Sequence, residues 1–259
     1  MSKTAPLISI ITATYNAGET LSVTIESLKK QSFKDFEYII IDGGSTDNTS
    51  DIIFNNYPGL IDIYLSEPDN GIYDAWNKGL KLANGEWISF IGAGDSYLPD
   101  ALENYAANIK NQLPHIEFLS SRVNVISSQG ENLFVIGKSW EWPEFLNRMT
   151  TAHVGALHSK RFFEKYGIFD ISYKIAGDYE LLMRPKENLK AAFIPLKTAN
   201  MLYGGVSQSF SILKEDMRLK INTAEVPIAI AILEFFVSFL KMIIRKISNS
   251  LHIYRSVKS

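Results

Sequence analysis

Four short apolar runs in the N-terminal part of the chain most constrain its fold. Each is rich in isoleucine or aromatic residues and lacks strict alternation with polar residues, which is typical of parallel strands buried on both faces. The runs occupy residues 7–13, 36–42, 61–67 and 86–93. Three segments lie between them, at residues 18–31, 46–57 and 71–83, and the first and third have apolar residues at helical spacing. This alternation predicts an α/β fold with a mostly parallel sheet and helices on both faces.

The rest of the chain continues the same domain. Residues 116–127 and 132–137 are apolar runs on either side of a short polar turn, which predicts a hairpin. Helical and irregular segments are expected from there to about residue 205. With 259 residues and 46% hydrophobic content, the chain can bury a large core, and no Pro-, Gly- or Ser-rich linker divides it. We expect one domain over residues 1–225, in two halves that meet near residue 98.

Composition excludes several classes of function. The net charge of -2 gives no indication of a nucleic-acid partner. The chain has no cysteine, which excludes disulfides, thiolate zinc sites and cysteine nucleophiles. The N-terminal residues lack the long apolar segment and cleavage site of a signal peptide, so we expect a cytoplasmic protein.

The stretch Gly92-Ala93-Gly94-Asp95 has two interpretations. Two glycines after an apolar strand resemble the start of a dinucleotide-binding turn. That turn needs a third glycine, where this chain has Tyr97, and it normally follows the first strand rather than the fourth. We therefore favour a loop built around the carboxylate of Asp95.

Acidic residues follow three of the predicted strands, at Asp42, Asp69 and Asp95. The carboxyl ends of parallel strands share one edge of a sheet, where α/β proteins bind ligands. A single aspartate there would be an ordinary helix cap or turn residue. Three carboxylates at one edge repel each other, which a divalent cation or polar ligand groups can offset. The repetition therefore favours a ligand site with Mg²⁺ or Mn²⁺, whose shell phosphate oxygens and water would complete.

Two blocks of the sequence resemble the family 2 glycosyltransferases. The first extends from TATYN at residues 12–16, through IIIDGGSTDNT, to the acid of FIGAGD, and the second occupies residues 151–184. The resemblance covers roughly residues 6–207. It implies the Rossmann-like GT-A fold, with a nucleotide-binding half at residues 1–98 and an acceptor half at residues 99–225. It also implies inverting transfer of a sugar from a nucleotide diphosphate donor to a saccharide or glycolipid acceptor, as in bacterial surface-polysaccharide synthesis.

The resemblance assigns residues to the donor site. Thr14, Tyr15 and Asn16 match the loop that helps enclose the nucleotide. Asp42 matches the acid that hydrogen-bonds the base, usually uracil, and a carboxylate can accept the imide N–H of that base. The remaining matched donor positions are Gly43, Gly44, Asp69 and Gly71.

Asp95 matches the last acid of the metal motif of the family. This chain departs from the common Asp-X-Asp pattern, because Ala93 stands at the first acid position. The resemblance thus implies Mn²⁺ or Mg²⁺ held by one protein carboxylate, with the diphosphate and water as the other ligands.

The second block supplies the acceptor side. Asp178 matches the catalytic base, which would take the proton of the acceptor hydroxyl. Alternatively it caps the helix that begins there, with Glu180 as the nearest other candidate base. His153 matches a recurrent histidine of the block, or else is a buried structural residue. Trp140 and Trp142 could stack on the sugar of the acceptor.

Two other functions fit parts of the pattern. A sugar-1-phosphate nucleotidyltransferase would share the fold and the metal. It would also need a basic first loop to bind a triphosphate, and residues 12–20 contain no Lys or Arg. A non-catalytic nucleotide-sugar-binding protein would not need a base such as Asp178. Residues 204–209, GGVSQS, match a glycine-rich loop near the end of the catalytic domain, or form an ordinary turn.

The C-terminal segment, residues 226–259, is predicted to be an amphipathic helix with a basic tail. Its apolar part is long enough to span a bilayer, but a central Glu or Lys disfavours that arrangement. From residue 241 onward the chain has five basic residues and no acid. We expect a peripheral helix on anionic lipid at the inner face of the cytoplasmic membrane. The alternative is a helix packed on its own domain or on the second subunit of a dimer. The polar residues expected on one face are Glu234, Ser238, Lys241 and Arg245.

Overall fold

The computed structural model describes residues 5–57, 59–111, 115–204 and 210–256, and for residues 56 and 245–256 it describes the backbone alone. Contacts divide the chain into two units, Met1–Gly204 and Gly205–Ser259. This division falls earlier than the one expected after residue 225, because helix α8 (Ser211–Asn222) packs against helix α9 (Ile228–Ser256).

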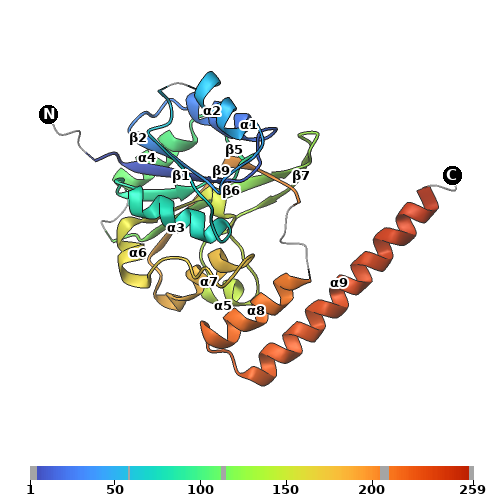
Figure 1. The fold of residues 1–259 in the computed structure, drawn as a ribbon. Coiled ribbons are helices and arrows are strands. Elements are labelled where there is room, and N and C mark those ends of the chain that lie inside the picture. Colours follow the sequence, from blue (N-terminus) through green and yellow to red (C-terminus); the bar gives the residue numbers. More distant parts are fainter. Residues whose placement is uncertain (1–4, 58, 112–114, 205–209, 257–259) are drawn as a thin grey trace. The chain divides into compact units, whose positions relative to one another are not determined.

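The predicted β-α-β series forms one side of the sheet in the first unit (Figure 1). Strand β1 lies between β2 and β4, and β3 lies beyond β2, with all these neighbours parallel. The carboxyl ends of the four strands therefore meet at one edge, as the sequence indicates. The strands are β1 (Ile8–Thr14), β2 (Phe36–Asp42), β3 (Ile63–Ser66) and β4 (Trp87–Phe90). The connecting helices are α1 (Leu21–Lys29), α2 (Thr49–Asn56) and α3 (Ile72–Leu82).

The second half extends the same sheet, so that nine strands of the described chain form one mixed sheet. Strand β8 is antiparallel to β4, β6 follows it, and the long strand β9 runs parallel to β6. The predicted hairpin is confirmed as β6 and β7. These strands are β5 (Ser96–Tyr97), β6 (Phe118–Ile126), β7 (Asn132–Ile136), β8 (Ala156–Ser159) and β9 (Ala191–Leu202). The remaining helices of this unit are α4 (Ala101–Asn111), α5 (Trp142–Asn147), α6 (Lys160–Tyr166) and α7 (Gly177–Met183).

The expectation of only helical and irregular structure between the hairpin and residue 205 is wrong for β8 and β9. Strand β9 contains Pro195, and its pairing with β6 shifts register there, from Ile194 to Lys197. A proline cannot donate to a strand ladder and is found at bulges of this kind. The bulge interrupts the alternating pattern by which a strand is recognised in sequence.

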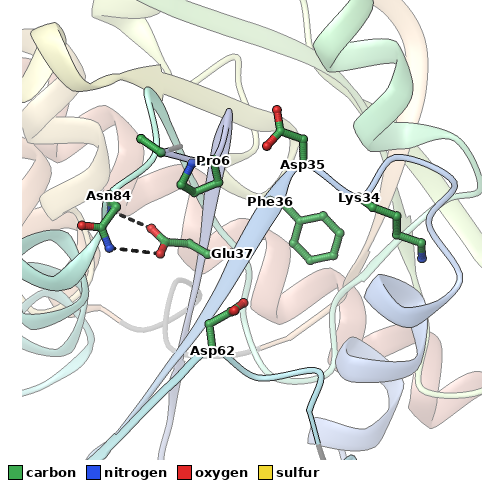
Figure 2. Close-up of a pocket in the computed structure, with 8 residues that line it drawn as sticks. Pro6, Lys34, Asp35, Phe36, Glu37, Asp62 and Asn84 are labelled. Carbon is green, nitrogen blue, oxygen red and sulfur yellow. Dashed lines mark hydrogen bonds between the residues drawn. The ribbon is translucent and has the colours of Figure 1, made fainter. Parts of the chain in front are cut away.

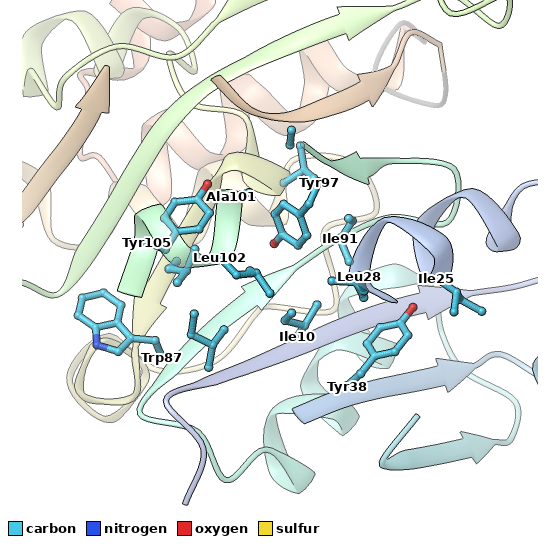
Figure 3. Close-up of a cluster of buried hydrophobic side chains, with 14 of the residues drawn as sticks. Ile10, Ile25, Leu28, Tyr38, Trp87, Ile91, Tyr97, Ala101, Leu102 and Tyr105 are labelled. Atoms are coloured by element: carbon cyan, nitrogen blue, oxygen red, sulfur yellow. The ribbon is translucent and has the colours of Figure 1, made fainter. Parts of the chain in front are cut away.

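Helices cover both faces of the sheet because alternate strand residues point to opposite sides. On one face, Ile10 and Tyr38 belong to a buried cluster with Leu28 of α1 and Tyr105 of α4 (Figure 3). On the other face, Ile11 faces α3 so closely that a Cβ at Gly79 would lie 2.5 Å from its Cγ2. Glycine at this position lets α3 approach β1 directly, which brings the N-terminus of α3 beside the carboxyl edge.

Candidate functional site

The first two loops at the carboxyl edge are tied together by Asn16. Its Oδ1 accepts the backbone N–H of Thr46 at 2.9 Å, and its own N–H donates to Ser45 Oγ at 2.8 Å. Its φ of +48° is left-handed, a conformation that asparagine tolerates better than most residues. Asp47 adds a further link by accepting the N–H of Gly18 at 3.0 Å. The side chain of Asn16 thus holds the loop in place.

Asp42 is fully buried at the end of β2. Its carboxylate accepts the N–H of Ser45 at 2.9 Å and the hydroxyl of Ser66 at 2.6 Å, together with the hydroxyl of Ser45. A carboxylate offers about four acceptor sites, so the neighbouring loops use most of its capacity. About one acceptor position, on Oδ1, is left for a nucleobase. Nothing in the sequence pattern indicated the two serines as its partners.

Thr14 ends β1 directly beside Asp42 in the strand register. Its hydroxyl is buried and has no hydrogen-bond partner among the described residues. Buried hydroxyls are nearly always paired, so this oxygen is a candidate partner for a ligand. The next residue, Tyr15, is 64% exposed. The edge therefore offers one unpaired polar atom and one exposed aromatic ring.

The loop after β3 packs against the loop after β2. A Cβ at Gly43 would lie 2.6 Å from Asp69 Oδ2 and 3.4 Å from the ring of Tyr15. Asp69 Oδ1 accepts the N–H of Gly71 at 2.8 Å, and Gly71 has a φ of +113° just before α3. Gly44, with a φ of +83°, completes the turn after Asp42. Gly43 is thus required by the approach of the Asp69 carboxylate, and the matched donor residues meet at one place.

Asp95 lies in the loop after β4, which α1 secures. The hydroxyl of Thr24 donates to the carbonyl of Asp95 at 2.7 Å and accepts the N–H of Gly94 at 2.9 Å. The carboxylate accepts the N–H of Leu202 at 2.9 Å. Burial raises the pKa of Asp95 to about 6, against the opposing effect of the Leu202 hydrogen bond. A short strand rather than a helix follows these glycines, which is unlike a dinucleotide-binding turn.

A metal at this edge would have few protein ligands. Among the described residues, no group of three or more His, Asp or Glu side chains could hold a metal ion. Ala93 offers no ligand, so Asp95 is the acid that the metal motif retains. One carboxylate fits Mg²⁺ or Mn²⁺ when substrate phosphates and water supply the other ligands.

Asp178 lies in the first turn of α7 and is held by a residue from the donor half. Its Oδ1 accepts the N–H of Tyr179 at 2.9 Å and lies 3.1 Å from the hydroxyl of Tyr73, which is shared with the Ile175 carbonyl at 2.6 Å. Tyr73 comes from α3, and burial, with the nearby charge of Asp178, raises its pKa. A Cβ at Gly177 would lie 2.8 Å from the Tyr73 ring. Glycine before Asp178 therefore allows the ring to approach the carboxylate.

Lys174 forms a second link between the halves. Its Nζ donates to the carbonyl of Asn70 at 2.6 Å, inside the loop that contains Asp69. Sequence reasoning missed both Lys174 and Tyr73. Their signal was present, since each lies within a matched block and close to a matched acid.

Glu180 forms a structural ion pair with Arg184. Arg184 Nη2 lies 2.6 Å from its carboxylate, and the guanidinium also donates to the carbonyls of Tyr166 and Ile168, each at 2.8 Å. Arg184 therefore links α7 to the end of α6 and to the segment that follows it. This placement leaves Asp178 as the carboxylate of α7 that contacts the donor half.

His153 lies in a buried aromatic cluster. Its ring stacks on Trp76, with centroids 5.0 Å apart and planes at 14°, and lies 5.0 Å from the ring of His158. Burial lowers the pKa of His153 to about 3. Burial and then the neighbouring His153 hold the pKa of His158 well below its usual range, with a partial compensation from the Ile88 backbone. The surroundings of His153 are those of a structural histidine.

Trp140 packs on two aromatic residues of α5, Trp142 and Phe145. The two indole rings stack with centroids 6.5 Å apart, and that of Trp140 lies 4.3 Å from the Phe145 ring. The hydroxyl of Tyr179 donates to the Phe145 carbonyl at 2.6 Å and so joins this cluster to α7. Both indoles are half-buried. Of the glycine-rich segment, residues 205–209 lie outside the described residues.

A cavity of about 490 Å³ lies elsewhere, where β1 and β2 begin (Figure 2). Glu37 on its wall accepts the hydroxyl of Ser9 at 2.5 Å and the backbone N–H of Asn84 at 2.6 Å. This carboxylate joins β2 to the turn before β4. The cavity is therefore remote from the strand ends that carry the matched residues.

Comparison with known proteins agrees with the geometry of the site. Residues 9–150 match the family described as Glycosyl transferase family 2. A "PGL/p-HBAD biosynthesis glycosyltransferase" of Mycobacterium tuberculosis is 32% identical over 183 residues, which is 70% of this chain and 70% of that protein. An uncharacterized glycosyltransferase of Rickettsia typhi is 28% identical over 188 residues, 68% of this chain and 58% of that protein.

Solved structures share the fold at low identity. Staphylococcus aureus TarS in complex with UDP superposes with a TM-score of 0.65 at 18% identity, covering 88% of this chain and 69% of that chain. The mannosyltransferase PcManGT of Pyrobaculum calidifontis, in complex with GDP-Man and Mn²⁺, superposes with a TM-score of 0.59 at 16% identity. The match covers 85% of this chain and 64% of that chain. The expected GT-A fold is confirmed. The chain therefore belongs to glycosyl transferase family 2 and is a glycosyltransferase.

Proposed function

We propose that this glycosyltransferase moves a sugar from a UDP-sugar to a hydroxyl of a saccharide or lipid-linked saccharide, with inversion at the anomeric carbon. One observation carries the proposal: Asp178 of the acceptor half is hydrogen-bonded to Tyr73, which directly follows the donor loop at Asp69–Gly71. A carboxylate held beside a donor loop is suited to take a proton from an incoming hydroxyl.

The donor is proposed to lie along the carboxyl edge. The unpaired hydroxyl of Thr14 and the exposed ring of Tyr15 support a nucleoside there. Uracil is favoured because Asp42 can accept its imide N–H. S. aureus TarS, which shares the fold, has been solved with UDP and with UDP-GlcNAc. PcManGT, which shares the fold, has been solved in complex with GDP-Man, so the fold alone does not fix the base, and we propose that Asp42 selects it.

Asp178 is proposed as the general base. In an in-line displacement, the acceptor hydroxyl attacks the anomeric carbon from the side opposite the nucleotide diphosphate, so the configuration inverts. The hydroxyl must lose its proton during this attack, and the Asp178 carboxylate takes it. Tyr73 positions this carboxylate, because its hydroxyl lies between Oδ1 and the Ile175 carbonyl, at 3.1 Å and 2.6 Å, and its ring is buried. Lys174 holds the loop beneath the sugar by its bond to Asn70.

Asp95 is proposed to hold Mn²⁺ or Mg²⁺ together with the donor diphosphate. When bound, the metal would neutralise charge on the departing diphosphate. PcManGT, which shares the fold, has been solved with Mn²⁺. The loop held by Thr24 fixes the carboxylate for this role.

Asp178→Asn tests the base. The amide keeps the size of the side chain but cannot accept the proton, so turnover should fall by about 10²–10⁴-fold. UDP affinity, measured by calorimetry, should stay near that of the wild type, because the donor contacts do not involve this residue. Asp51→Asn on α2 is the matched control and should keep full activity.

Two results would contradict the assignment. Transfer at a near wild-type rate would remove Asp178 from the chemistry. Parallel loss of UDP binding and turnover would make it a structural cap. Sustained UDP binding with no turnover of any sugar donor by the wild-type protein would favour the non-catalytic alternative.

We also propose that the enzyme works at the inner face of the cytoplasmic membrane, where a lipid-linked acceptor is available. The basic C-terminal segment supports this placement. Within the described residues, no helix combines the length and apolar character needed to cross a bilayer.

A further inference from the structure

Helix α9 directs its central polar residues inward. Glu234 forms an ion pair with Lys220 of α8 at 3.0 Å, and the Lys220 side chain is buried. Ser238, one turn further on, is half-buried, and Ala231, one turn earlier, is fully buried. The sequence pattern places Glu234 and Ser238 on one polar face of the helix, and in the structure this part of the face is on the side of α8.

The opposite side of α9 is apolar and exposed. At about 100° per residue, its large side chains cover roughly 200° of the helix circumference. Soluble proteins seldom leave so continuous an apolar surface without a partner. The exposed side chains are Ile228, Ile230, Ile232, Leu233, Phe236, Val237, Leu240 and Ile244.

Positive charge accompanies this surface. Lys241 is exposed on its border. From Lys241 to the end of the chain there are five basic residues and no acid. A cationic apolar helix complements an anionic lipid surface, because its apolar side chains enter the boundary of the acyl chains while its cations contact the headgroups.

We propose that the exposed side of α9 docks on the surface of an anionic membrane, with the helix axis in the plane of the interface. The polar side of α9 packs against α8 instead of facing water, and Lys220 of α8 neutralises the charge of Glu234 there. The docking does not depend on which sugar or acceptor the catalytic unit uses.

A second copy of the chain is the competing occupant. Ile230, Leu233, Val237, Leu240 and Ile244 are spaced by alternating steps of three and four, as in a two-stranded coiled coil. Such a coil would bury this seam but leave Ile232 and Phe236 at its margin. Lys241 would face Phe236 of the other helix rather than an acid. A lipid surface covers the whole width of the exposed side and also uses the cation.

Phe236→Ser combined with Leu240→Ser tests the docking. Both residues are exposed, at 60% and 58%, so the fold should be retained. The full chain should co-sediment with vesicles of phosphatidylcholine and phosphatidylglycerol, and the double variant should lose about 100-fold or more in partition coefficient. The matched control, Phe54→Ser with Leu196→Ser, alters side chains that are 63% and 49% exposed in the first unit, and should bind as the wild type does.

Charge and oligomeric state complete the test. Lys241→Gln should weaken binding to the anionic vesicles about fivefold, with little change on pure phosphatidylcholine. The proposal is overturned if the wild-type protein does not bind anionic vesicles, or if the double variant binds as tightly as the wild type. A wild-type dimer by light scattering that the double variant dissociates, without vesicle binding, would identify a second copy as the occupant.

Discussion

The buried histidine pair should make this protein sensitive to acid. None of the four ring nitrogens of His153 and His158 meets a hydrogen-bond partner with good geometry among the described residues, and burial lowers both pKa values. Both are therefore neutral in the folded protein at neutral pH, whereas in the unfolded chain each protonates near pH 6.5. Stability is complete above about pH 6.5 and is lost as the pH falls, because the unfolded state then binds more protons.

The size of the effect follows from the pKa difference. With a folded value of about 3 for His153, the free energy of unfolding should fall by about 2 kcal/mol between pH 7 and pH 5. His158 should contribute a loss of the same sign, since its pKa is also well below the usual range. For a chain of this size, about 2 kcal/mol corresponds to roughly 4–8 °C in Tm.

His153→Phe should remove the part of the acid-induced loss of stability that comes from His153. Phenylalanine fits an aromatic environment formed by Trp76, Phe90 and Phe169, and it cannot take up a proton. The measurement is thermal unfolding at several pH values, compared as the difference between variant and wild type, which cancels contributions from other groups. His115→Phe, at an exposed position, is the control. If the difference stays constant from pH 7 to pH 5, the reasoning from burial is refuted.

Further predictions concern the carboxylates and their supports. Asp42→Asn should weaken UDP binding by about 1.5–3 kcal/mol in calorimetry, and an unchanged affinity would remove Asp42 from base recognition. Asp95→Ala should abolish metal-stimulated turnover, which activity assays with and without a chelator would detect. Burial raises the pKa of Asp95 to about 6, so in the wild type protons should compete with the metal below that pH, and Mn²⁺ affinity should fall about tenfold per pH unit. Gly177→Ala should displace Tyr73 and lower kcat more than UDP affinity, and equal losses of both would count against the positioning role.

Much of the donor edge could be predicted from sequence, because its determinants are local. Buried parallel strands are continuous apolar runs, and each is followed by the loop that contains its functional residues. The placement of Asp42 and Asp95 at the ends of two parallel strands of one sheet needed only the order of elements along the chain. The hairpin of β6 and β7 was also visible, since a turn and two apolar runs are adjacent in sequence.

The pairing of distant segments could not be predicted in this way. Strand β9 joins β6 across many intervening residues, and its bulge at Pro195 hides the strand pattern. Asn16 matched a nucleotide-enclosing loop, yet its side chain binds the backbone of Thr46. The hydrogen-bond partner of a loop side chain depends on how the loops pack against each other. The spacing of residue types along the chain does not reveal that packing.

The sequence alone determined the fold class, the family and the set of candidate acids, because periodicity and local motifs involve residues that are close together in the chain. Only the tertiary structure placed Tyr73 against Asp178, buried His153 among aromatic rings, and turned Glu234 of α9 toward Lys220. Each of these is a contact between different elements, and the first two join elements far apart in the chain. Such contacts depend on which faces bury one another, and a buried charge or hydroxyl takes the partner that packing brings within reach.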